Sequence, residues 1–233
     1  MKFAITGMPL NRSVWFLFAC LTIIFLGSVL ISPRIGYGQL NLNFDDIEID
    51  ILHVQGNVYM LVGAGGNITL QVGREGVLIV DSMYPELADK VLGVIRELSD
   101  QPIRYLINTH VHPDHTGGNA ILAQAGTNFA AGNVAGLIGD ASDTAAIIAH
   151  ENVLLRMSSQ EAPPPFEAWP TDTFFNSSKE VYFNGEAVRV LHQPAAHTDG
   201  DSIIFFRRSD VISTGDLFVT TGYPYIDLAR GGS

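Results

Sequence analysis

The sequence predicts an α+β fold in which two sheets pack face to face, as a sandwich of two similar halves. Between residues 47 and 80, β-branched residues alternate with glycine-containing turns, a pattern typical of consecutive strands. A segment with apolar residues at helical spacing follows at residues 86–98. Strand-like segments then return after a proline-rich stretch at residues 162–173, so the order of strands followed by a helix is repeated.

The first half is predicted to hold five strands and three helices. Strands are expected where β-branched residues are bounded by glycines, at residues 49–54, 58–62, 67–72 and 76–80, with a short buried strand at 104–108. Helices are expected where apolar residues recur at helical spacing, at residues 86–98, 119–125 and 144–157.

The second half is predicted to be shorter. Its strands are expected at residues 180–183, 187–192, 202–207 and 210–213. The glycine-rich segment that ends at Ser233 comes before any closing helix or strand, so we expect this half to be incomplete.

Residues 1–38 have the parts of a secretory signal. These are a basic start at Lys2, an apolar run at residues 14–31 and small residues before Gln39. The run is nearly long enough to span a bilayer, so an uncleaved membrane anchor is the alternative. We therefore expect residues 39–233 to form the folded domain, in the periplasm or outside the cell.

Residues 39–233 are strongly acidic, with ten Lys and Arg against 24 Asp and Glu, a formal charge of −14. This charge argues against nucleic acid as a partner, because phosphate backbones are bound by Lys- and Arg-rich patches. The only cysteine, Cys20, precedes this domain, which excludes disulfides and thiolate metal ligands from it. We expect a small-molecule substrate, and membrane contact only through an uncleaved N-terminal segment.

Three of the seven histidines lie within six residues, together with an aspartate. His110 and His112 follow the expected strand at 104–108, and residues two apart on an extended chain point the same way. Asp114 and His115 come where a proline and two glycines turn the chain, so they can face a second point nearby. Imidazoles and carboxylates suit zinc, and also iron or manganese. The run therefore predicts a metal site.

Two later residues fit the same site. His197 lies in a turn of small residues before the expected strand at 202–207, and Asp216 follows the expected strand at 210–213. Each residue alone is more typical of a turn than of a ligand. Because both lie at strand ends, where loops converge, we expect them to join the histidine run.

These three motifs, in this order, resemble the metallo-β-lactamase superfamily, and the resemblance covers essentially everything from Ile47 onward. It implies an αββα sandwich with the metals at one edge between the sheets. It also implies that His110, His112 and His197 hold a first metal. Asp114 and His115 would hold a second metal, and Asp216 would bridge the two. The implied cofactor is one or two zinc ions, with iron or manganese as alternatives.

Two features depart from the family pattern. The second metal of the family normally takes one more histidine from a later Gly-His-Gly loop, and the sequence offers none before Ser233. The chain therefore resembles a C-terminally truncated member in which only the first site is complete. Asp216, in a Thr-Gly-Asp-Leu context, is closer to the glyoxalase-II-like and general hydrolase branch, which favours ester or thioester cleavage over lactam cleavage.

The resemblance implies a metal-dependent hydrolase that cleaves an ester, thioester, lactone or β-lactam. A zinc-bound hydroxide would attack the carbonyl carbon, because a metal ion lowers the pKa of bound water to about 7. Asp114 would be catalytic, orienting the nucleophile and accepting its proton. Two alternatives stay open: a mononuclear-iron persulfide dioxygenase with the same ligands, and a catalytically inactive metal-binding fragment.

Other residues near the motifs carry weaker expectations. The glycine-rich loop at residues 63–67 is either a flap over the site or an ordinary turn. His150 is expected on a helix face, and His192 is expected to pack within the structure. Asp199 and Asp201 either accept ring N–H groups of the ligand histidines or are solvated loop residues.

Overall fold

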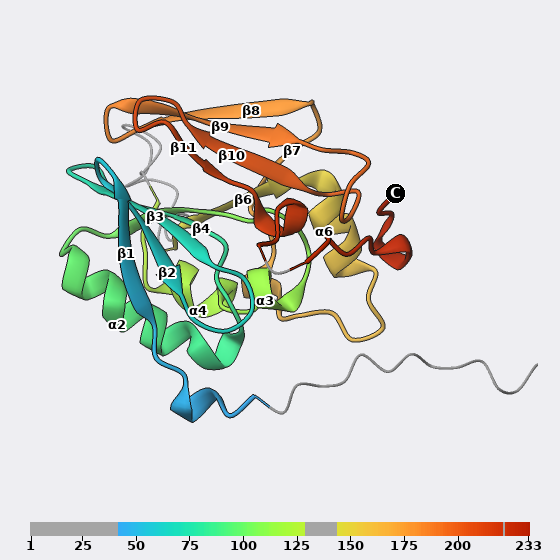
Figure 1. The fold of residues 1–233 in the computed structure, drawn as a ribbon, viewed down its shortest axis with the longest axis horizontal. Coiled ribbons are helices and arrows are strands. Elements are labelled where there is room, and N and C mark those ends of the chain that lie inside the picture. Colours follow the sequence, from blue (N-terminus) through green and yellow to red (C-terminus); the bar gives the residue numbers. More distant parts are fainter. Residues whose placement is uncertain (1–41, 129–143, 221) are drawn as a thin grey trace, which may run out of the picture. The chain divides into compact units, whose positions relative to one another are not determined.

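Two sheets make up most of the computed structural model, which describes residues 42–128, 144–220 and 222–233 (Figure 1). The leader predicted at residues 1–38 lies outside these ranges. Within them, no helix has both the length and the apolar character needed to cross a membrane.

The first sheet has seven strands in sequential order. Its first four strands pair antiparallel and its last four pair parallel. The strands are β1 (Asp50–Gln55), β2 (Val58–Val62), β3 (Ile68–Gly73), β4 (Gly76–Val80), β5 (Ile103–Ile107), β6 (Ala146–His150) and β7 (Asp172–Phe174). The five strands expected before residue 110 are confirmed to within one residue at either end.

The second sheet has four antiparallel strands in the order β11-β10-β9-β8. These are β8 (Ser178–Phe183), β9 (Glu186–His192), β10 (Ser202–Phe206) and β11 (Val211–Ser213), and all four were expected from the sequence. The two sheets together confirm the predicted α+β sandwich.

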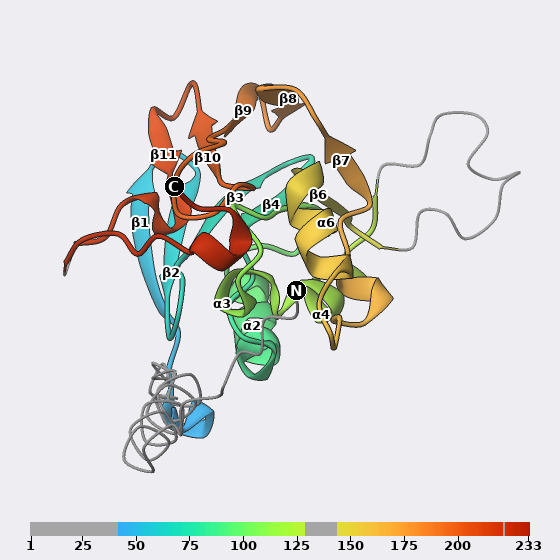
Figure 2. The same cartoon turned by 90° about the vertical axis from the view of Figure 1, so that its right-hand side faces the viewer.

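The helices lie against the first sheet or at its edge (Figures 1 and 2). They are α2 (Ala88–Leu98), α3 (Pro113–Thr116), α4 (Asn119–Gln124) and α6 (Glu151–Ser158). Short 3-10 turns are η1 (Phe44–Asp46), η2 (Pro85–Leu87), η4 (Phe166–Ala168), η5 (Gly215–Leu217) and η6 (Leu228–Arg230). Among the described residues, no helix covers the outer face of the second sheet.

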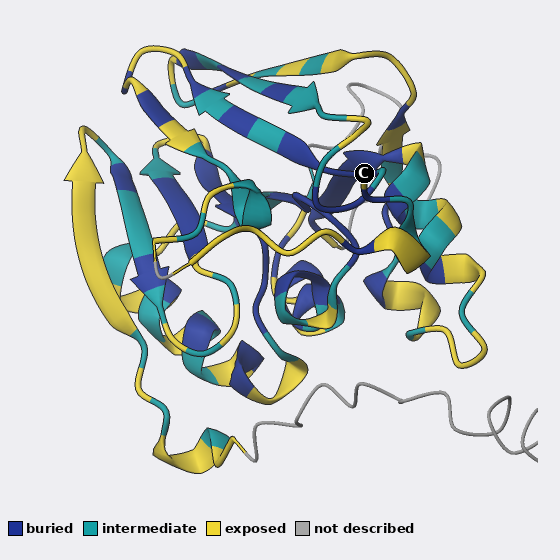
Figure 3. Cartoon of the chain, turned by 45° about the vertical axis from the view of Figure 1, so that its right-hand side comes forward, coloured by how far each residue is buried: buried dark blue, intermediate teal, exposed yellow. Residues whose placement is uncertain are grey.

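Strand β4 shows why the core has two layers. Successive side chains of a strand point to opposite faces. Val77 and Ile79 pack with the residues of α2, while Leu78 and Val80 pack with Phe183 and other residues of the second sheet. Every residue of β4 is therefore buried, as the dark colour of the central strands in Figure 3 shows. The helices, the first sheet and the second sheet thus form three layers, with one part of the core on each side of the first sheet.

The prediction of one helix over residues 144–157 is wrong in its first part. Residues Ala146–His150 form the fully buried strand β6, and α6 begins only at Glu151. An apolar run buried on both faces has no periodicity that separates a strand from a helix. His150 consequently lies at the junction, where its Nδ1 accepts a hydrogen bond of 3.3 Å from the backbone N–H of Asn152.

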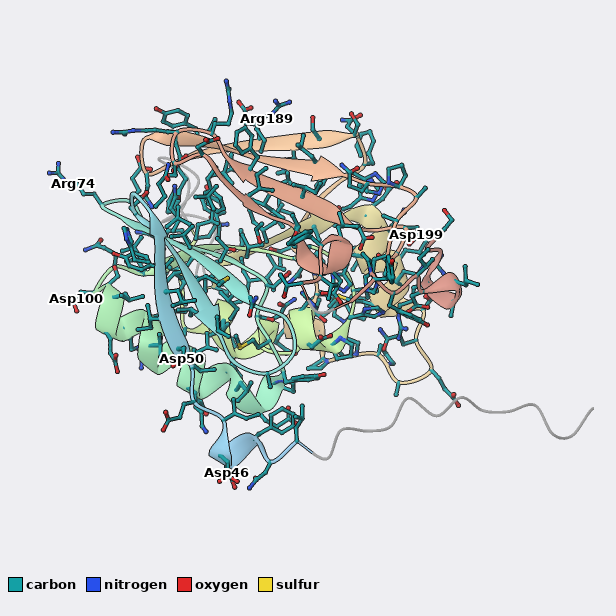
Figure 4. All side chains as sticks on the ribbon, in the orientation of Figure 1. Asp46, Asp50, Arg74, Asp100, Arg189 and Asp199 are labelled. Carbon is teal, nitrogen blue, oxygen red and sulfur yellow. The ribbon has the colours of Figure 1, made fainter. Side chains whose placement is uncertain are left out.

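Most charged side chains lie on the outside, as Figure 4 shows for Asp46, Asp50, Arg74 and Asp100. Four carboxylates among the described residues are instead buried: Asp81, Glu186, Asp201 and Asp227. A buried charge must be paired or hydrogen-bonded to be tolerated. Two of the four lie at the site described next.

Candidate metal centre

Three imidazoles converge at the edge where the two sheets meet. His110 and His112 follow β5, and His197 lies in the loop between β9 and β10. Nε2 of His197 lies 2.8 Å from Nδ1 of His112 and 3.2 Å from Nε2 of His110. The remaining pair, Nε2 of His110 and Nδ1 of His112, is 3.0 Å apart. The structure thus brings together the three residues predicted to hold the first metal.

A second group of ligand-type residues adjoins the first. Asp114 and His115 lie on α3, and Asp216 lies on η5 after β11. Nε2 of His115 is 3.1 Å from Oδ1 of Asp216 and 3.6 Å from Oδ2 of Asp114. Oδ2 of Asp216 is also 3.6 Å from Nε2 of His197. Asp216 therefore belongs to both groups.

The outward-facing nitrogens of three imidazoles are held by groups that can only accept a hydrogen bond. Nε2 of His112 lies 2.8 Å from a carboxylate oxygen of Asp227, and Nδ1 of His115 lies 2.7 Å from one of Asp81. Nδ1 of His197 lies 2.6 Å from the carbonyl oxygen of Tyr225. Each of these nitrogens must carry the hydrogen and donate it. When the ring is neutral, the other ring nitrogen, which faces the site, presents a lone pair.

The Nδ1–H tautomer of His110 is fixed by the hydroxyl of Thr109. The hydroxyl of Thr109 donates to Oδ2 of Asp81 at 2.8 Å, so its oxygen is free to accept from Nδ1 of His110 at 3.0 Å. Nε2 of His110 is left with its lone pair toward the site. Asp81 thus fixes the tautomers of two histidines, one directly and one through a threonine.

This donor set fits a bound cation. The site-facing nitrogens of four imidazoles and two carboxylates lie close together, and neutral imidazole with carboxylate is a ligand set that zinc accepts. Nε2 of His115 is buried and makes no hydrogen bond to any described residue, although a carboxylate oxygen is 3.1 Å away. A buried polar atom without a partner is costly, and a metal ion would satisfy it.

The electrostatics differ between the two groups. Burial, and then the neighbouring histidines, lower the pKa of His110, and burial also lowers the pKa of His112, so both rings favour the neutral form that binds metal. Burial alone would lower the pKa of His115 as well. The carboxylates of Asp81, Asp216 and Asp114 outweigh it and raise that pKa well above its usual value. The second group therefore attracts positive charge.

The glycine-rich loop at residues 63–67 packs directly on the second group. A Cβ atom at Gly66 would lie 2.3 Å from Cε1 of His115, and one at Gly65 would lie 2.5 Å from Cβ of Asp114. Gly65 also has a φ of +79°, which favours glycine. The loop therefore packs closely against both His115 and Asp114.

Polar residues that flank the histidine run form a buried hydrogen-bond network with its backbone. The amides of Asn108 and Asn119 hydrogen-bond to each other at 2.9 and 3.0 Å, and the hydroxyl of Ser82 donates to Asn119 at 2.8 Å. The backbone N–H of Ser82 donates to the carbonyl of His115 at 2.9 Å. This buried network fixes the backbone from which the ligand side chains project.

The carboxylates that hold the ligand histidines are not the ones proposed from the sequence. Asp199 pairs with Arg156 at 2.7 Å, and Asp201 accepts from the backbone N–H and hydroxyl of Thr198, so neither accepts from a ligand ring. Asp81 and Asp227 perform that role. Asp81 directly follows β4, at the same edge of the sheet as His110, and this position could have identified it from the sequence as a partner of the ligand histidines. No sequence pattern near Asp227 indicates such a role.

The other histidines lie outside the two groups. His150 and His192 stack with ring centroids 3.5 Å apart and planes inclined by 8°. Nε2–H of His192 donates to the carbonyl of Asp199 at 2.8 Å, which agrees with the packing role expected for it. His53 is exposed, and its ring contacts the carbonyl of Gly56.

Two curated proteins are similar to short stretches of the chain. The linear primary-alkylsulfatase of Pseudomonas sp. (strain ATCC 19151) is 44% identical over 45 residues, which are 19% of this chain and 8% of that protein. The coenzyme F420H(2) oxidase of Methanothermobacter marburgensis is 35% identical over 63 residues, or 25% of this chain and 16% of that protein. The chain thus spans only a small part of the length of these relatives.

Solved structures share the fold at low sequence identity. A class B3 di-zinc metallo-beta-lactamase from an Alaskan soil metagenome has a TM-score of 0.54 at 17% identity, covering 72% of this chain and 60% of its own. A metallo-beta-lactamase of Cronobacter sakazakii has a TM-score of 0.53 at 20% identity, with 76% and 66% covered. A sec-alkyl sulfatase has a TM-score of 0.55 at 15% identity, with 71% and 31% covered.

A family model matches a larger part of the chain than either curated protein. Residues 61–233 match the model of the Metallo-beta-lactamase superfamily. The matched range contains all six ligand-type residues of the two groups, and the fold around them is shared with solved members. The chain belongs to the metallo-beta-lactamase superfamily.

Proposed function

We propose that this chain is a zinc-dependent hydrolase. The observation that carries the proposal is the fixed orientation of four imidazoles, each of which has an acceptor for its outer N–H, so that its other nitrogen faces one site and, in the neutral ring, directs a lone pair into it. Two carboxylates complete the set. Family membership supports the same conclusion.

Zinc would be held by His110, His112 and His197, and a second ion by Asp114 and His115, with Asp216 shared. When bound, zinc supplies Lewis acidity and lowers the pKa of water so that hydroxide is available at neutral pH. Iron and manganese are accepted by the same ligand types, so metal analysis of the purified protein is part of the test.

The chain's own carboxylates would place and deprotonate the attacking water. Asp114 has a quarter of its side chain exposed, whereas His115 beside it is almost wholly buried. It can therefore reach solvent and accept a proton, as a general base must. Burial would raise the pKa of Asp216, but the neighbouring rings of His115, His197 and His112 outweigh burial and lower it, which favours the ionised carboxylate.

We propose an ester or thioester as the substrate, with a lactone, a β-lactam or an alkyl sulfate as further candidates. The Thr-Gly-Asp-Leu context of Asp216 supports the first two. The short similarity to a linear primary-alkylsulfatase is the reason to include the last. Specificity depends on loops rather than on ligands, so a panel is needed.

The test is turnover by metal-free protein reloaded with Zn²⁺, on one compound of each class. We expect zinc-dependent cleavage of an ester or thioester. Iron in the purified protein, with oxygen consumption on a persulfide, would replace the hydrolase with a dioxygenase. Tight zinc binding without turnover of any compound would indicate an inactive metal-binding chain.

We also propose that residues 1–38 direct export. The basic start, apolar run and small residues before Gln39 support this. Fractionation of an expressing bacterium, with N-terminal sequencing of the product, tests it. A product that starts near Gln39 outside the cytoplasm is expected, and a cytoplasmic full-length product would contradict it.

A further inference from the structure

The segment at residues 222–233 touches the three-histidine site at two of its three ligands. The carbonyl of Tyr225 accepts from Nδ1 of His197 at 2.6 Å, and the carboxylate of Asp227 accepts from Nε2 of His112 at 2.8 Å. The backbone N–H of Asp227 also donates to the carbonyl of His197 at 2.8 Å. One short segment therefore bridges ligands that are 85 residues apart in the sequence.

Asp227 is itself held in place by several bonds. Nη1 of Arg230 donates to its Oδ2 at 2.7 Å, the oxygen that also accepts from His112. Its Oδ1 accepts from the backbone N–H groups of Ala229 and Arg230 at 3.0 and 3.2 Å. The Asp227 side chain is 5% exposed, so this arrangement is shielded from water. The carboxylate therefore has little freedom to turn away from the ring.

His112 faces the site through the opposite ring nitrogen from the other two first-metal ligands. It is the one predicted first-metal ligand that faces the site with Nδ1, whereas His110 and His197 face it with Nε2. Its ring is also less buried than those of His110 and His197. Without an acceptor at Nε2, the hydrogen could move to Nδ1 and block the lone pair.

We propose that Asp227 is a positioning residue for metal binding. It holds His112 in the tautomer whose Nδ1 is free, and Arg230 keeps the Asp227 carboxylate in the orientation that does so. This inference rests on the proposed metal site but not on the hydrolysis of any particular substrate. Outer carboxylates of this kind fix the ring orientation and raise the basicity of the ligand.

The test compares the full chain with Asp227→Ala, Asp227→Asn and Arg230→Gln. Zinc affinity is measured by competition with a chromophoric chelator. We expect Asp227→Ala to weaken it about 10- to 100-fold, the usual effect of losing such a partner. Asp227→Asn keeps a neutral acceptor and should lie between wild type and Asp227→Ala; it decides the matter if Asp227→Ala does not fold. Arg230→Gln should weaken binding less than Asp227→Ala does.

A second measurement does not involve metal. Long-range ¹H–¹⁵N correlation spectra of the metal-free protein distinguish the two tautomers of His112. We expect the Nε2–H tautomer in wild type and in Arg230→Gln, and an increase of the Nδ1–H tautomer in Asp227→Ala.

Asp199→Asn is the matched control, because Asp199 is also paired with an arginine but contacts no imidazole through its carboxylate. Its zinc affinity should stay within about twofold of wild type, as expected for a carboxylate that supports no ligand. The Nδ1–H tautomer in wild type, or wild-type zinc affinity in both Asp227 variants, would overturn the role of Asp227. Wild-type protein that binds no zinc while His112 keeps the Nε2–H tautomer would instead refute the proposed metal site.

Discussion

Nδ1 of His115 lies 2.7 Å from Oδ2 of Asp81, and both side chains are only 2% exposed. The same carboxylate accepts from the backbone N–H of Thr109 at 2.7 Å and from its hydroxyl at 2.8 Å. Asp81 therefore contacts His115 of one ligand group directly and is linked to His110 of the other group through Thr109. It does so with a φ of +66°, a left-handed backbone that few residues other than glycine, asparagine and aspartate adopt readily.

Asp81→Asn isolates the charge, because asparagine tolerates the same backbone conformation. The amide cannot accept all three bonds, so we expect zinc affinity at the Asp114–His115–Asp216 group to fall about 10- to 100-fold. The free energy of unfolding should fall by about 1–3 kcal/mol as buried donors lose their acceptor. Chelator competition and urea denaturation measure the two effects. Asp210→Asn, at an exposed aspartate with a φ of +54°, is the control and should change neither.

Gly66→Ala tests the contact between the glycine-rich loop and His115. The added Cβ would lie 2.3 Å from Cε1 of the ring, so either the loop or the ligand must move. We expect a loss of about 1–3 kcal/mol in the free energy of unfolding, the usual cost of overpacking. The loss should be accompanied by weaker zinc binding.

Gly93→Ala is the opposite case for the same substitution. Gly93 lies within α2, and a Cβ there would meet nothing within 4 Å. Alanine should raise the free energy of unfolding by about 0.5–1 kcal/mol, because glycine is unfavourable inside a helix. Urea denaturation measures both variants. Equal effects from Gly66→Ala and Gly93→Ala would mean that the loop does not contact His115.

The stability of the metal-free protein should pass through a maximum near pH 6.5, the ordinary pKa of histidine. His110 and His112 have lowered pKa values, so below pH 6.5 the unfolded chain binds more protons and stability falls with decreasing pH. His115 has a raised pKa, so its contribution is complete below pH 6.5 and is lost as pH rises through the folded-state pKa.

Urea denaturation across this range checks the maximum. In His115→Gln, the decline above pH 6.5 should disappear while the decline on the acidic side remains. A midpoint that does not change with pH in wild type would contradict the protonation states assigned to these rings.

His112→Ala removes a predicted ligand directly. We expect the protein to lose zinc on dialysis, and zinc-dependent turnover to be lost with it. Metal analysis after dialysis measures the first, and the substrate panel measures the second. His53→Ala removes an exposed histidine outside both groups and should retain zinc as wild type does. Full activity in His112→Ala would exclude this site as the reaction centre.

The strands were predictable because their patterns are local. Residues 58–62 and 76–80 have the same bounds in the sequence prediction and in the structure, since β-branched runs between glycines admit little else. The helix prediction over 144–157 failed at the apolar run before Glu151. That run becomes a strand because it pairs in parallel with β5, which is about 40 residues away in the sequence. A local pattern of residues carries no information about such a distant neighbour.

The ligand residues were predictable from the sequence, but the carboxylates that hydrogen-bond to the ligand histidines were not. The close spacing of His110, His112 and His115 identifies them as candidate ligands in the sequence, and the structure places His197 and Asp216 beside them. Asp227 lies 115 residues after His112, in a segment with no recognisable ligand motif. Its role depends on how residues 222–233 cross the site, which is a property of the tertiary structure. Asp199 and Asp201 were candidates for that role because they are near His197 in sequence, but neither carboxylate accepts from a ligand ring.

His110 and His112 extend from the first sheet, whereas His197 extends from the second. An ion bound by all three would join the two layers as a covalent cross-link does, in a domain that has no cysteine to form one. Such a link exists only in the native chain, so at a metal concentration 100 times the Kd it would add about 2.7 kcal/mol to stability. The supply of metal around the protein, rather than the redox state of its compartment, would then determine how firmly the sandwich is held together.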